Sequence, residues 1–138
     1  DNARTPMQWD ESEHAGFTKG TPWIQVNPNY TYVNAKSQIK DSNSIYSYYK
    51  ELIRFRKEME VLVYGTYNLL EENDENLYVY TRTLGNTTLL VICNFTDKEL
   101  SYAIPREYEQ AKIIINNYPH RTNNSIIRPY EAVVYCKE

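Results

Sequence analysis

The sequence predicts a mainly β protein, in which an antiparallel β-sandwich follows an irregular arm and one amphipathic helix. Residues 1–40 show no regular hydrophobic period, residues 43–59 show a helical one, and the remainder shows short runs with a period of two. Short strands separated by turn residues are typical of a sandwich. We therefore divide the chain into two parts, 1–60 and 61–138.

The arm, residues 1–40, is rich in aromatic side chains but is too broken to be regular. Trp9, Phe17 and Trp23 lie among three prolines and two glycines. A loop of this length is usually functional or disordered, and its aromatic content argues against disorder. We expect an ordered loop that packs on another surface.

The segment 43–59 is predicted to be a helix, because its apolar residues recur at the spacing of one helical face. The side chains of residues 41–43, Asp-Ser-Asn, are candidates to cap its first turn. Its apolar stripe, which includes Ile45, Tyr49 and Leu52, requires a covering surface.

The remainder of the chain predicts strands. The pair Gly85-Asn86 between two β runs predicts a hairpin, and the almost wholly apolar run 88–95 indicates a central strand. Gly65 suggests a bulge, and the polar run 71–76 indicates a solvated turn. The six predicted strands cover residues 63–70, 77–83, 87–95, 98–105, 111–117 and 128–138.

Composition and charge narrow the classes of partner. The 138 residues carry a net charge of −3, which argues against nucleic acid as a partner, and no apolar run is long enough to span a membrane. His14 and His120 are isolated, so we expect neither a metal nor a cofactor. Cys93 and Cys136 lie in apolar runs, where two reduced thiols are favoured over the alternative of a disulfide.

Arg4 is the candidate binding residue of the arm. Its guanidinium could fix the hydroxyls or carboxylate of a ligand, although an ion pair that shapes the loop is the simpler interpretation of the residue alone. Carboxylates beside aromatic rings also occur in glycosidases. Their spacing does not show that they face a common point, and capping or solvated roles are favoured for Asp1, Asp10, Glu11 and Glu13.

Two stretches of the arm carry a family resemblance. DNARTPMQWD at 1–10 and AGFTKGTPWIQVNPNY at 15–30 resemble the end of the catalytic barrel in oligo-1,6-glucosidases of the α-amylase superfamily. Trehalose-6-phosphate hydrolases and dextran glucosidases are near relatives in that family. The resemblance continues through SIYSYYKELIRFRKE, VYGTYNLL, LLVICNFT and RPYEAVVY, and so covers essentially the whole chain.

This resemblance implies a place for each part of the chain. Residues 1–60 would be the last βα loop and the eighth helix left over from a (β/α)8 barrel, and residues 61–138 the C-terminal sandwich. A complete barrel needs about 250 residues. The catalytic Asp, Glu and Asp of the family belong to motifs absent from this sequence, so no catalytic residue is assigned and the fragment is expected to be inactive. By the same resemblance Arg4 is substrate-binding, and Asp1 and Asn2 shape the loop.

The expected parent is a retaining, exo-acting α-glucosidase for α-1,6-linked gluco-oligosaccharides. A fragment of a trehalose-6-phosphate hydrolase is one alternative. Another is a stand-alone carbohydrate-binding or interaction β-sandwich module, with Tyr78 and Tyr80 as its sugar platform.

The expected partners are an α-gluco-oligosaccharide in the intact enzyme, the protein's own catalytic barrel, and a second copy of the isolated fragment. The second copy would dock through the helix face of Ile45, Tyr49 and Leu52. Free cysteines and family habit predict a cytoplasmic location.

Overall fold

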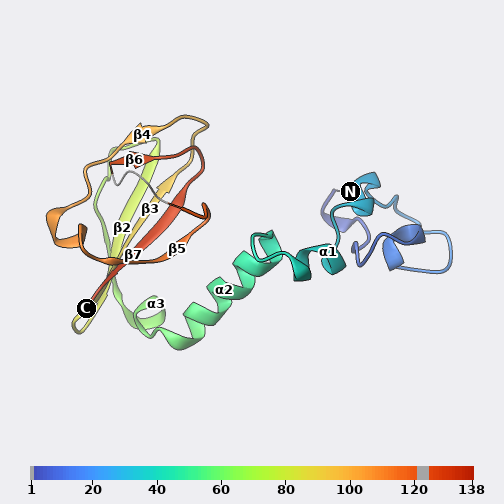
Figure 1. Cartoon of the computed structure of the whole chain (residues 1–138), viewed down its shortest axis with the longest axis horizontal. Coiled ribbons are helices and arrows are strands. Elements are labelled where there is room, and N and C mark those ends of the chain that lie inside the picture. Colours follow the sequence, from blue (N-terminus) through green and yellow to red (C-terminus); the bar gives the residue numbers. More distant parts are fainter. Residues whose placement is uncertain (1, 121–124) are drawn as a thin grey trace. The chain divides into compact units, whose positions relative to one another are not determined.

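The computed structural model describes residues 2–120 and 125–138, and it divides into two compact units (Figure 1). The first unit is Asp1–Ile53 and the second is Arg54–Glu138. The division falls inside helix α2, Ile45–Glu58. Each unit is described in turn.

The first unit begins with short turns and two helices. Three 3-10 turns, η1 (Asn2–Arg4), η2 (Glu13–Gly16) and η3 (Pro28–Thr31), confirm most of the predicted irregular arm. Helix α1, Ala35–Lys40, lies inside the segment that the sequence predicted to be irregular. Its six residues are too few to show a period, and Asn34 starts it by accepting a hydrogen bond from the Ser37 amide.

Backbone hydrogen bonds tie the start of the arm to α1. The carbonyl oxygens of Gln8 and Trp9 accept from the amides of Ala35 and Lys36 at 2.9 and 3.0 Å. The side chain of Gln8 donates to Asn29 Oδ1 at 2.9 Å. Segments distant in the sequence are thereby held together by polar contacts.

A left-handed turn at residues 14–16 closes the loop that begins at Trp9. His14, Ala15 and Gly16 all have positive φ, at 55°, 58° and 65°. The carbonyl oxygen of Ala15 accepts from the amides of both Trp9 and Asp10, at 2.9 and 3.3 Å. These two hydrogen bonds compensate for backbone strain of about 1 kcal/mol or more at each non-glycine residue.

Helix α2 confirms the helix predicted over 43–59. The predicted cap was wrong, because Ser44 caps the helix, and its Oγ accepts from the Ser47 amide at 3.1 Å. The carboxylate of Asp41 instead accepts from the Asn43 amide at 2.8 Å and forms the turn before the helix.

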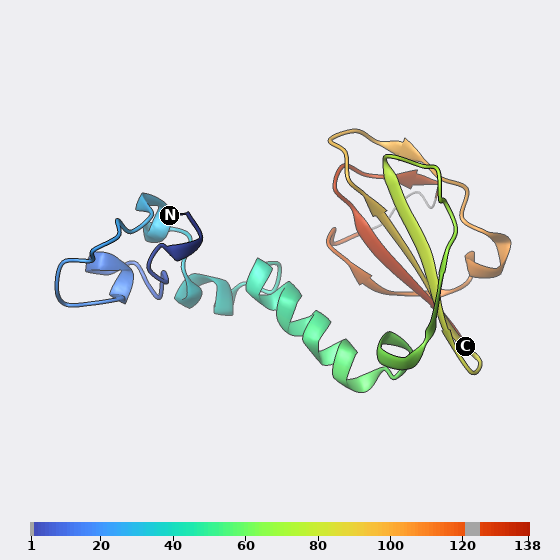
Figure 2. The ribbon, with the colours of Figure 1, turned by 180° about the vertical axis from the view of Figure 1, so that it is seen from behind.

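The second unit is a sandwich of two antiparallel sheets, as predicted (Figures 1 and 2). The larger sheet has the order β1-β2-β3-β7-β5, and the smaller pairs β4 with β6. The strands are β1 (Thr66–Leu69), β2 (Leu77–Leu84), β3 (Thr87–Asn94), β4 (Leu100–Ser101), β5 (Lys112–Asn116), β6 (Ile126–Ile127) and β7 (Ala132–Lys137).

Several features of the second unit differ from the prediction. Strand β4 spans only Leu100–Ser101 of the predicted 98–105, and β7 begins at Ala132 rather than at residue 128. Strand β6 was missed, because two residues give no detectable alternation. Residues predicted to begin the first strand form helix α3, Val61–Tyr64, instead. Gly65 makes no bulge, because it joins α3 to β1, where an added Cβ would lie 2.4 Å from the carbonyl oxygen of Val61.

The predicted hairpin and central strand are confirmed. Leu84 pairs with Thr87 across the turn, in which Gly85 has a φ of 57°. Strand β3 is the third of five and buries residues on both of its faces. The chain reversal therefore depends on a glycine that adopts the left-handed conformation without steric cost.

Two clusters of buried side chains flank the larger sheet. Residues on β7 alternate between them, with Val133 and Tyr135 in one and Val134 and Cys136 in the other. The first cluster reaches the smaller sheet through Ile127, and the second reaches α3 through Val61. Helix η4, Arg106–Tyr108, contributes the buried ring of Tyr108 to the first cluster.

Both cysteines are free, as predicted. Cys93 pairs with Ala132 in the register of β3 and β7, and Cys136 pairs with Leu89. Four residues of strand separate the two pairs, roughly 13 Å, whereas a disulfide needs Cα atoms within about 7 Å. Burial raises the pKa of both thiols. No helix in the described part of the chain is long and apolar enough to cross a membrane.

Candidate functional site

Arg4, the candidate binding residue, lies in η1 and faces an aromatic ring from a distant part of the arm. Its guanidinium carbon is 5.2 Å from the centre of the Trp23 ring. The Trp23 side chain is 81% exposed, and Arg4 is exposed as well. Pro22 and Gly20 exclude regular structure from the segment that presents the ring, where the Gly20 amide donates to Thr18 Oγ1.

The side chain of Arg4 is suited to bind a polar ligand. The guanidinium carries five N–H donors in a fixed fork, and its carbon lies over the Trp23 ring. Such a fork can donate paired hydrogen bonds to neighbouring hydroxyls. Asp1 lies outside the described residues, and Asn2 is described only by its backbone in η1.

Asp10 and Glu11 act as structural groups in the arm. Asp10 Oδ1 accepts from the Ser12 amide at 2.9 Å and from Ser12 Oγ, and these hydrogen bonds lower the pKa of Asp10. Glu11 Oε1 lies 2.7 Å from Lys36 Nζ, a contact that lowers the pKa of Glu11. A general acid needs the opposite shift. The capping role favoured from the sequence fits Asp10, whereas Glu11 is neither capping nor merely solvated but forms an ion pair.

His14 and the remaining carboxylates form no metal site in the described part of the chain. His14 Nε2 lies 3.7 Å from Glu13 Oε1, and both side chains are partly or largely exposed. Among residues 2–120 and 125–138, no group of three His, Cys, Asp or Glu side chains could hold a metal ion.

An apolar cleft of about 420 Å³ lies within the first unit. We call it the arm cleft. The helix stripe predicted to need a cover lies at it, with Ile45 70% exposed and Tyr49 62% exposed, while Leu52 is partly buried. The RTPMQW string supplies the other wall, which no period in the sequence could have revealed. Its apolar lining consists of Pro6, Met7, Val33, Ala35, Ile45, Tyr46 and Tyr49.

The predicted tyrosine platform on the sandwich is not flat. The rings of Tyr78 and Tyr80 lie 5.0 Å apart but are tilted by 42°, and Tyr80 is half-buried. Tyr67, which sequence reasoning missed, packs on Tyr80 at 5.2 Å and bonds the Tyr78 hydroxyl at 3.1 Å. That hydrogen bond raises the pKa of Tyr67 to about 12. The pairing of β1 with β2 is what brings Tyr67 to this group.

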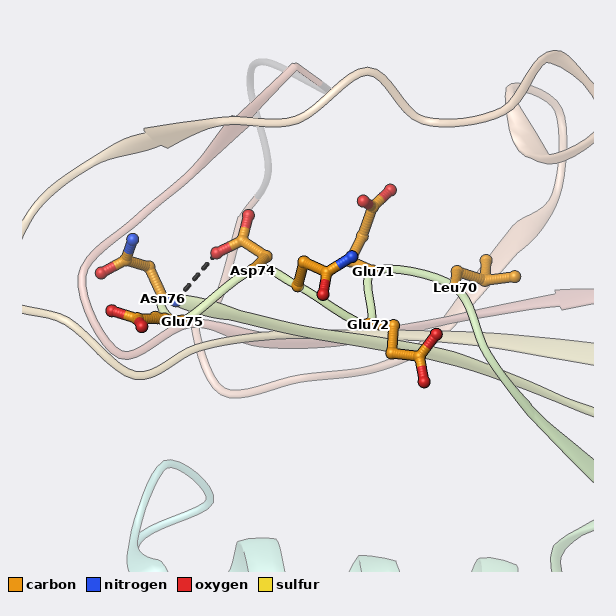
Figure 3. A pocket seen from close by; sticks show the side chains of 7 residues that line it. Leu70, Glu71, Glu72, Asp74, Glu75 and Asn76 are labelled. Atoms are coloured by element: carbon orange, nitrogen blue, oxygen red, sulfur yellow. Dashed lines mark hydrogen bonds between the residues drawn. The ribbon is translucent and has the colours of Figure 1, made fainter.

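The acidic run 71–76 forms an open hollow in the second unit (Figure 3). Asp74 Oδ1 accepts from the amides of Asn76 and Leu77 at 2.8 and 2.9 Å, which closes the turn. The side chains of Glu71 and Glu72 point away from each other (Figure 3). The carboxylates therefore do not converge on one point.

A buried ion pair fixes the turn before β7. Glu131 is fully buried and accepts from Arg128 Nη2 at 2.8 Å and from Asn116 Nδ2 at 2.9 Å. Arg128 also stacks on the Tyr118 ring at 4.0 Å. We call Asn116, Arg128 and Glu131 the Glu131 anchor. Sequence reasoning missed it, and the only signal is a charged pair beside Pro129 in the RPYE string.

Two family models match successive parts of the chain. Residues 1–65 match the α-amylase catalytic domain, and residues 77–134 match the α-amylase SusG C-terminal domain. The arm that carries Arg4 thus falls in the first match, and most of the sandwich falls in the second.

Whole-chain relatives agree with these matches. The chain is 50% identical to an oligo-1,6-glucosidase of Parageobacillus thermoglucosidasius over 98% of its length, and 40% identical to a trehalose-6-phosphate hydrolase of Bacillus subtilis. It spans about a quarter of each of these proteins, 25% in both cases.

Solved structures show the same likeness. The trehalose-6-phosphate hydrolase of Bacillus licheniformis matches 99% of the chain at 40% identity with a TM-score of 0.90. The isomaltulose synthase of Klebsiella sp. LX3 matches 100% at 37% identity with a TM-score of 0.91. The chain covers 26% of each structure.

Proposed function

We propose, on the premise that this chain belongs to the α-amylase family, that it is the C-terminal part of a retaining α-glucosidase. The proposed substrates are α-1,6-linked gluco-oligosaccharides, from which the enzyme would release glucose at the end of the oligosaccharide. The 50% identity to an oligo-1,6-glucosidase over nearly the whole chain is the observation that carries this proposal.

Arg4 is proposed to contact the sugar in the intact enzyme. The RTPMQW string that contains it lies within the part matched by the catalytic-domain family, and Arg4 is an exposed residue of the arm. Forked donors suit adjacent sugar hydroxyls. Asp1 and Asn2 are proposed to shape the loop that carries Arg4.

The chain itself is proposed to lack hydrolytic activity. The catalytic carboxylates of the family belong to motifs that this sequence does not contain, and Asp10 and Glu11 are engaged in the contacts described above. The barrel that supplies those carboxylates is also the proposed partner of the arm cleft. Exposed Met7, Ile45 and Tyr49 support this assignment, because apolar surface of this kind requires a cover.

A trehalose-6-phosphate hydrolase is the second candidate, supported by the identity to the Bacillus subtilis and Bacillus licheniformis enzymes. The two candidates differ in the charge of the substrate. The full-length protein should hydrolyse isomaltose with net retention at the anomeric carbon, followed by NMR of the first-formed glucose. A clear preference for trehalose-6-phosphate would establish the second candidate instead.

The chain alone, assayed in parallel, should release no glucose. The stand-alone sugar-binding alternative predicts that isomaltose or maltose perturbs the tyrosine absorbance of the isolated chain through Tyr78 and Tyr80. We expect no saturable change, because the tilted rings offer no shared plane for a pyranose. A saturable change would revive that alternative.

The isolated chain is proposed to dimerise through the face of Ile45, Tyr49 and Leu52. Two of these three side chains are more than half exposed, which leaves apolar surface for a second copy. Sedimentation equilibrium should show self-association that Ile45→Ser with Tyr49→Ser abolishes. A monomer at all concentrations would refute the proposal. Two free cysteines support a proposed cytoplasmic location.

A further inference from the structure

We infer that Trp23 is a positioning residue for Arg4, and that its ring sets the direction in which the guanidinium presents its donors to the sugar. The inference rests on the proposed role of Arg4 in substrate binding. It is carried by the cation–π contact in which the Arg4 guanidinium carbon lies over the Trp23 ring, 5.2 Å from its centre.

The contact joins two segments that are far apart in the sequence. Arg4 lies in η1, and Trp23 lies 19 positions later, in a segment without helix or strand. An arginine side chain has many rotamers, and each hydrogen bond to a ligand requires that one of them be selected. A ring that attracts the guanidinium favours a subset of these rotamers before the ligand arrives.

A cation–π contact and hydrogen bonding to a ligand use different features of the Arg4 side chain. The ring attracts the cation through its face, whereas donation to hydroxyls uses the plane of the guanidinium. We assign Trp23 no sugar contact of its own. Its effect should appear only through Arg4, and this sets it apart from a residue that merely holds the loop.

The experiment is a double-mutant cycle on kcat/KM for isomaltose, measured on the full-length protein. Arg4→Ala alone should lower kcat/KM by roughly 10- to 150-fold, the range for a lost hydrogen bond to a charged group. Trp23→Leu alone should lower it by roughly 2- to 30-fold, the range for a cation–π contact. In the Arg4→Ala background, Trp23→Leu should have no further effect, because the residue that it positions is gone.

Conservative and matched variants separate positioning from folding. Trp23→Phe keeps an aromatic face and should restore most of kcat/KM, while Tyr32→Leu removes a ring that is 73% exposed elsewhere in the arm. Thermal midpoints of all variants are measured in parallel. Equal losses for Tyr32→Leu and Trp23→Leu, or additive effects in the cycle, would overturn the inference.

The two hypotheses fail in different ways. If Arg4→Ala leaves kcat/KM unchanged, the proposed substrate contact of Arg4 is wrong, and the positioning role falls with it. If Arg4→Ala has its expected effect but Trp23→Leu does not, or if the losses add, only the role of Trp23 is wrong.

Discussion

The first unit buries almost no large apolar side chain, whereas the second is built around them. Among residues 3–53, the buried residues are Pro6, Ala15, Asn34 and Ser44. In the second unit, Leu90 and Ile92 on β3 and Val133 on β7 are wholly buried. The contrast teaches that a polar framework can specify the course of a loop while leaving its aromatic side chains outside.

The two units also differ in how far they bury large aromatic side chains. Trp9 and Trp23 in the arm are 53% and 81% exposed, whereas Tyr108 and Tyr135 in the sandwich are 4% and 2% exposed. Burial of a large side chain contributes about 1.5–3 kcal/mol, so the sandwich has a source of stability that the arm lacks. The arm is shaped for contacts that it does not itself contain.

The largest expected loss of stability comes from a substitution in the Glu131 anchor of the second unit. Glu131→Ala leaves the Arg128 guanidinium and the Asn116 amide without their buried acceptor, so the free energy of unfolding should fall by about 3–5 kcal/mol. Urea denaturation of the chain, followed by far-UV circular dichroism, measures it.

The exposed pair of Arg54 and Glu58 in α2 provides the matched control. Its side chains are 47% and 55% exposed, and Glu58→Ala should cost about 0.3–0.5 kcal/mol. Similar costs for the two carboxylates would mean that burial of Glu131 does not determine its contribution.

A smaller effect is expected in the first unit, from Gly16→Ala. Gly16 has a φ of 65°, and an added Cβ would lie 2.8 Å from Asp10 Oδ1. The substitution should therefore lower the free energy of opening of the left-handed turn by about 1–2 kcal/mol. Hydrogen exchange at the Trp9 and Asp10 amides should accelerate by roughly 5- to 30-fold. Exchange in β3 should not change.

Gly20→Ala provides the comparison in the same arm. Gly20 has no positive φ, and its nearest neighbour to an added Cβ, Thr18 Oγ1, is 3.8 Å away. Gly20→Ala should therefore not change the hydrogen-exchange rates of the Trp9 and Asp10 amides. Acceleration by both variants would show that the arm lacks the specific turn that separates it from a flexible loop.

The smallest effect concerns the tyrosines of the sandwich above neutral pH. The pKa of Tyr67 is raised to about 12 by its hydrogen bond with Tyr78, and that of Tyr102 to about 12, chiefly by burial. The pKa of an unfolded tyrosine is about 10. The folded state holds these protons longer, so their contribution to stability is complete below pH 10 and is lost as the pH rises toward 12.

Ultraviolet titration of tyrosinate should detect the deprotonation of Tyr67 and Tyr102 at a pH of about 12. Tyr78→Phe should lower the pKa of Tyr67 from about 12 and leave that of Tyr102 in place. A single titration step at about pH 10 for all tyrosines would contradict the hydroxyl contact between Tyr67 and Tyr78.

The sequence predicted the sandwich better than the arm for the same physical reason. Alternation along β2 and the apolar run of β3 record burial directly, so strands and hairpin could be read from them. Helix α1 and the turn at 14–16 depend on hydrogen bonds between distant residues, as from Ala35 to Gln8, which leave no periodic record. Strand β6 also leaves no periodic pattern in the sequence, because it has only two residues.

The candidate site shows the same limit. Arg4 could be singled out as a residue, and the resemblance added the proposed role. Its cation–π contact with Trp23 could not be predicted, because the spacing of residues in an irregular segment does not show which of them meet in the folded chain. Glu131 was missed because a buried carboxylate resembles an exposed one until its partners are known.

The burial of Asn94 has a consequence for production of the protein in a eukaryotic secretory host. Asn94-Phe95-Thr96 is an acceptor sequence for N-linked glycans, but Asn94 is 3% exposed and its amide donates to the carbonyl oxygens of Lys98, Ile127 and Arg128. Asn86-Thr87-Thr88 is another acceptor sequence, and Asn86 lies exposed in the β2–β3 turn. Of these two sites, folded protein from such a host should carry a glycan at Asn86 and none at Asn94.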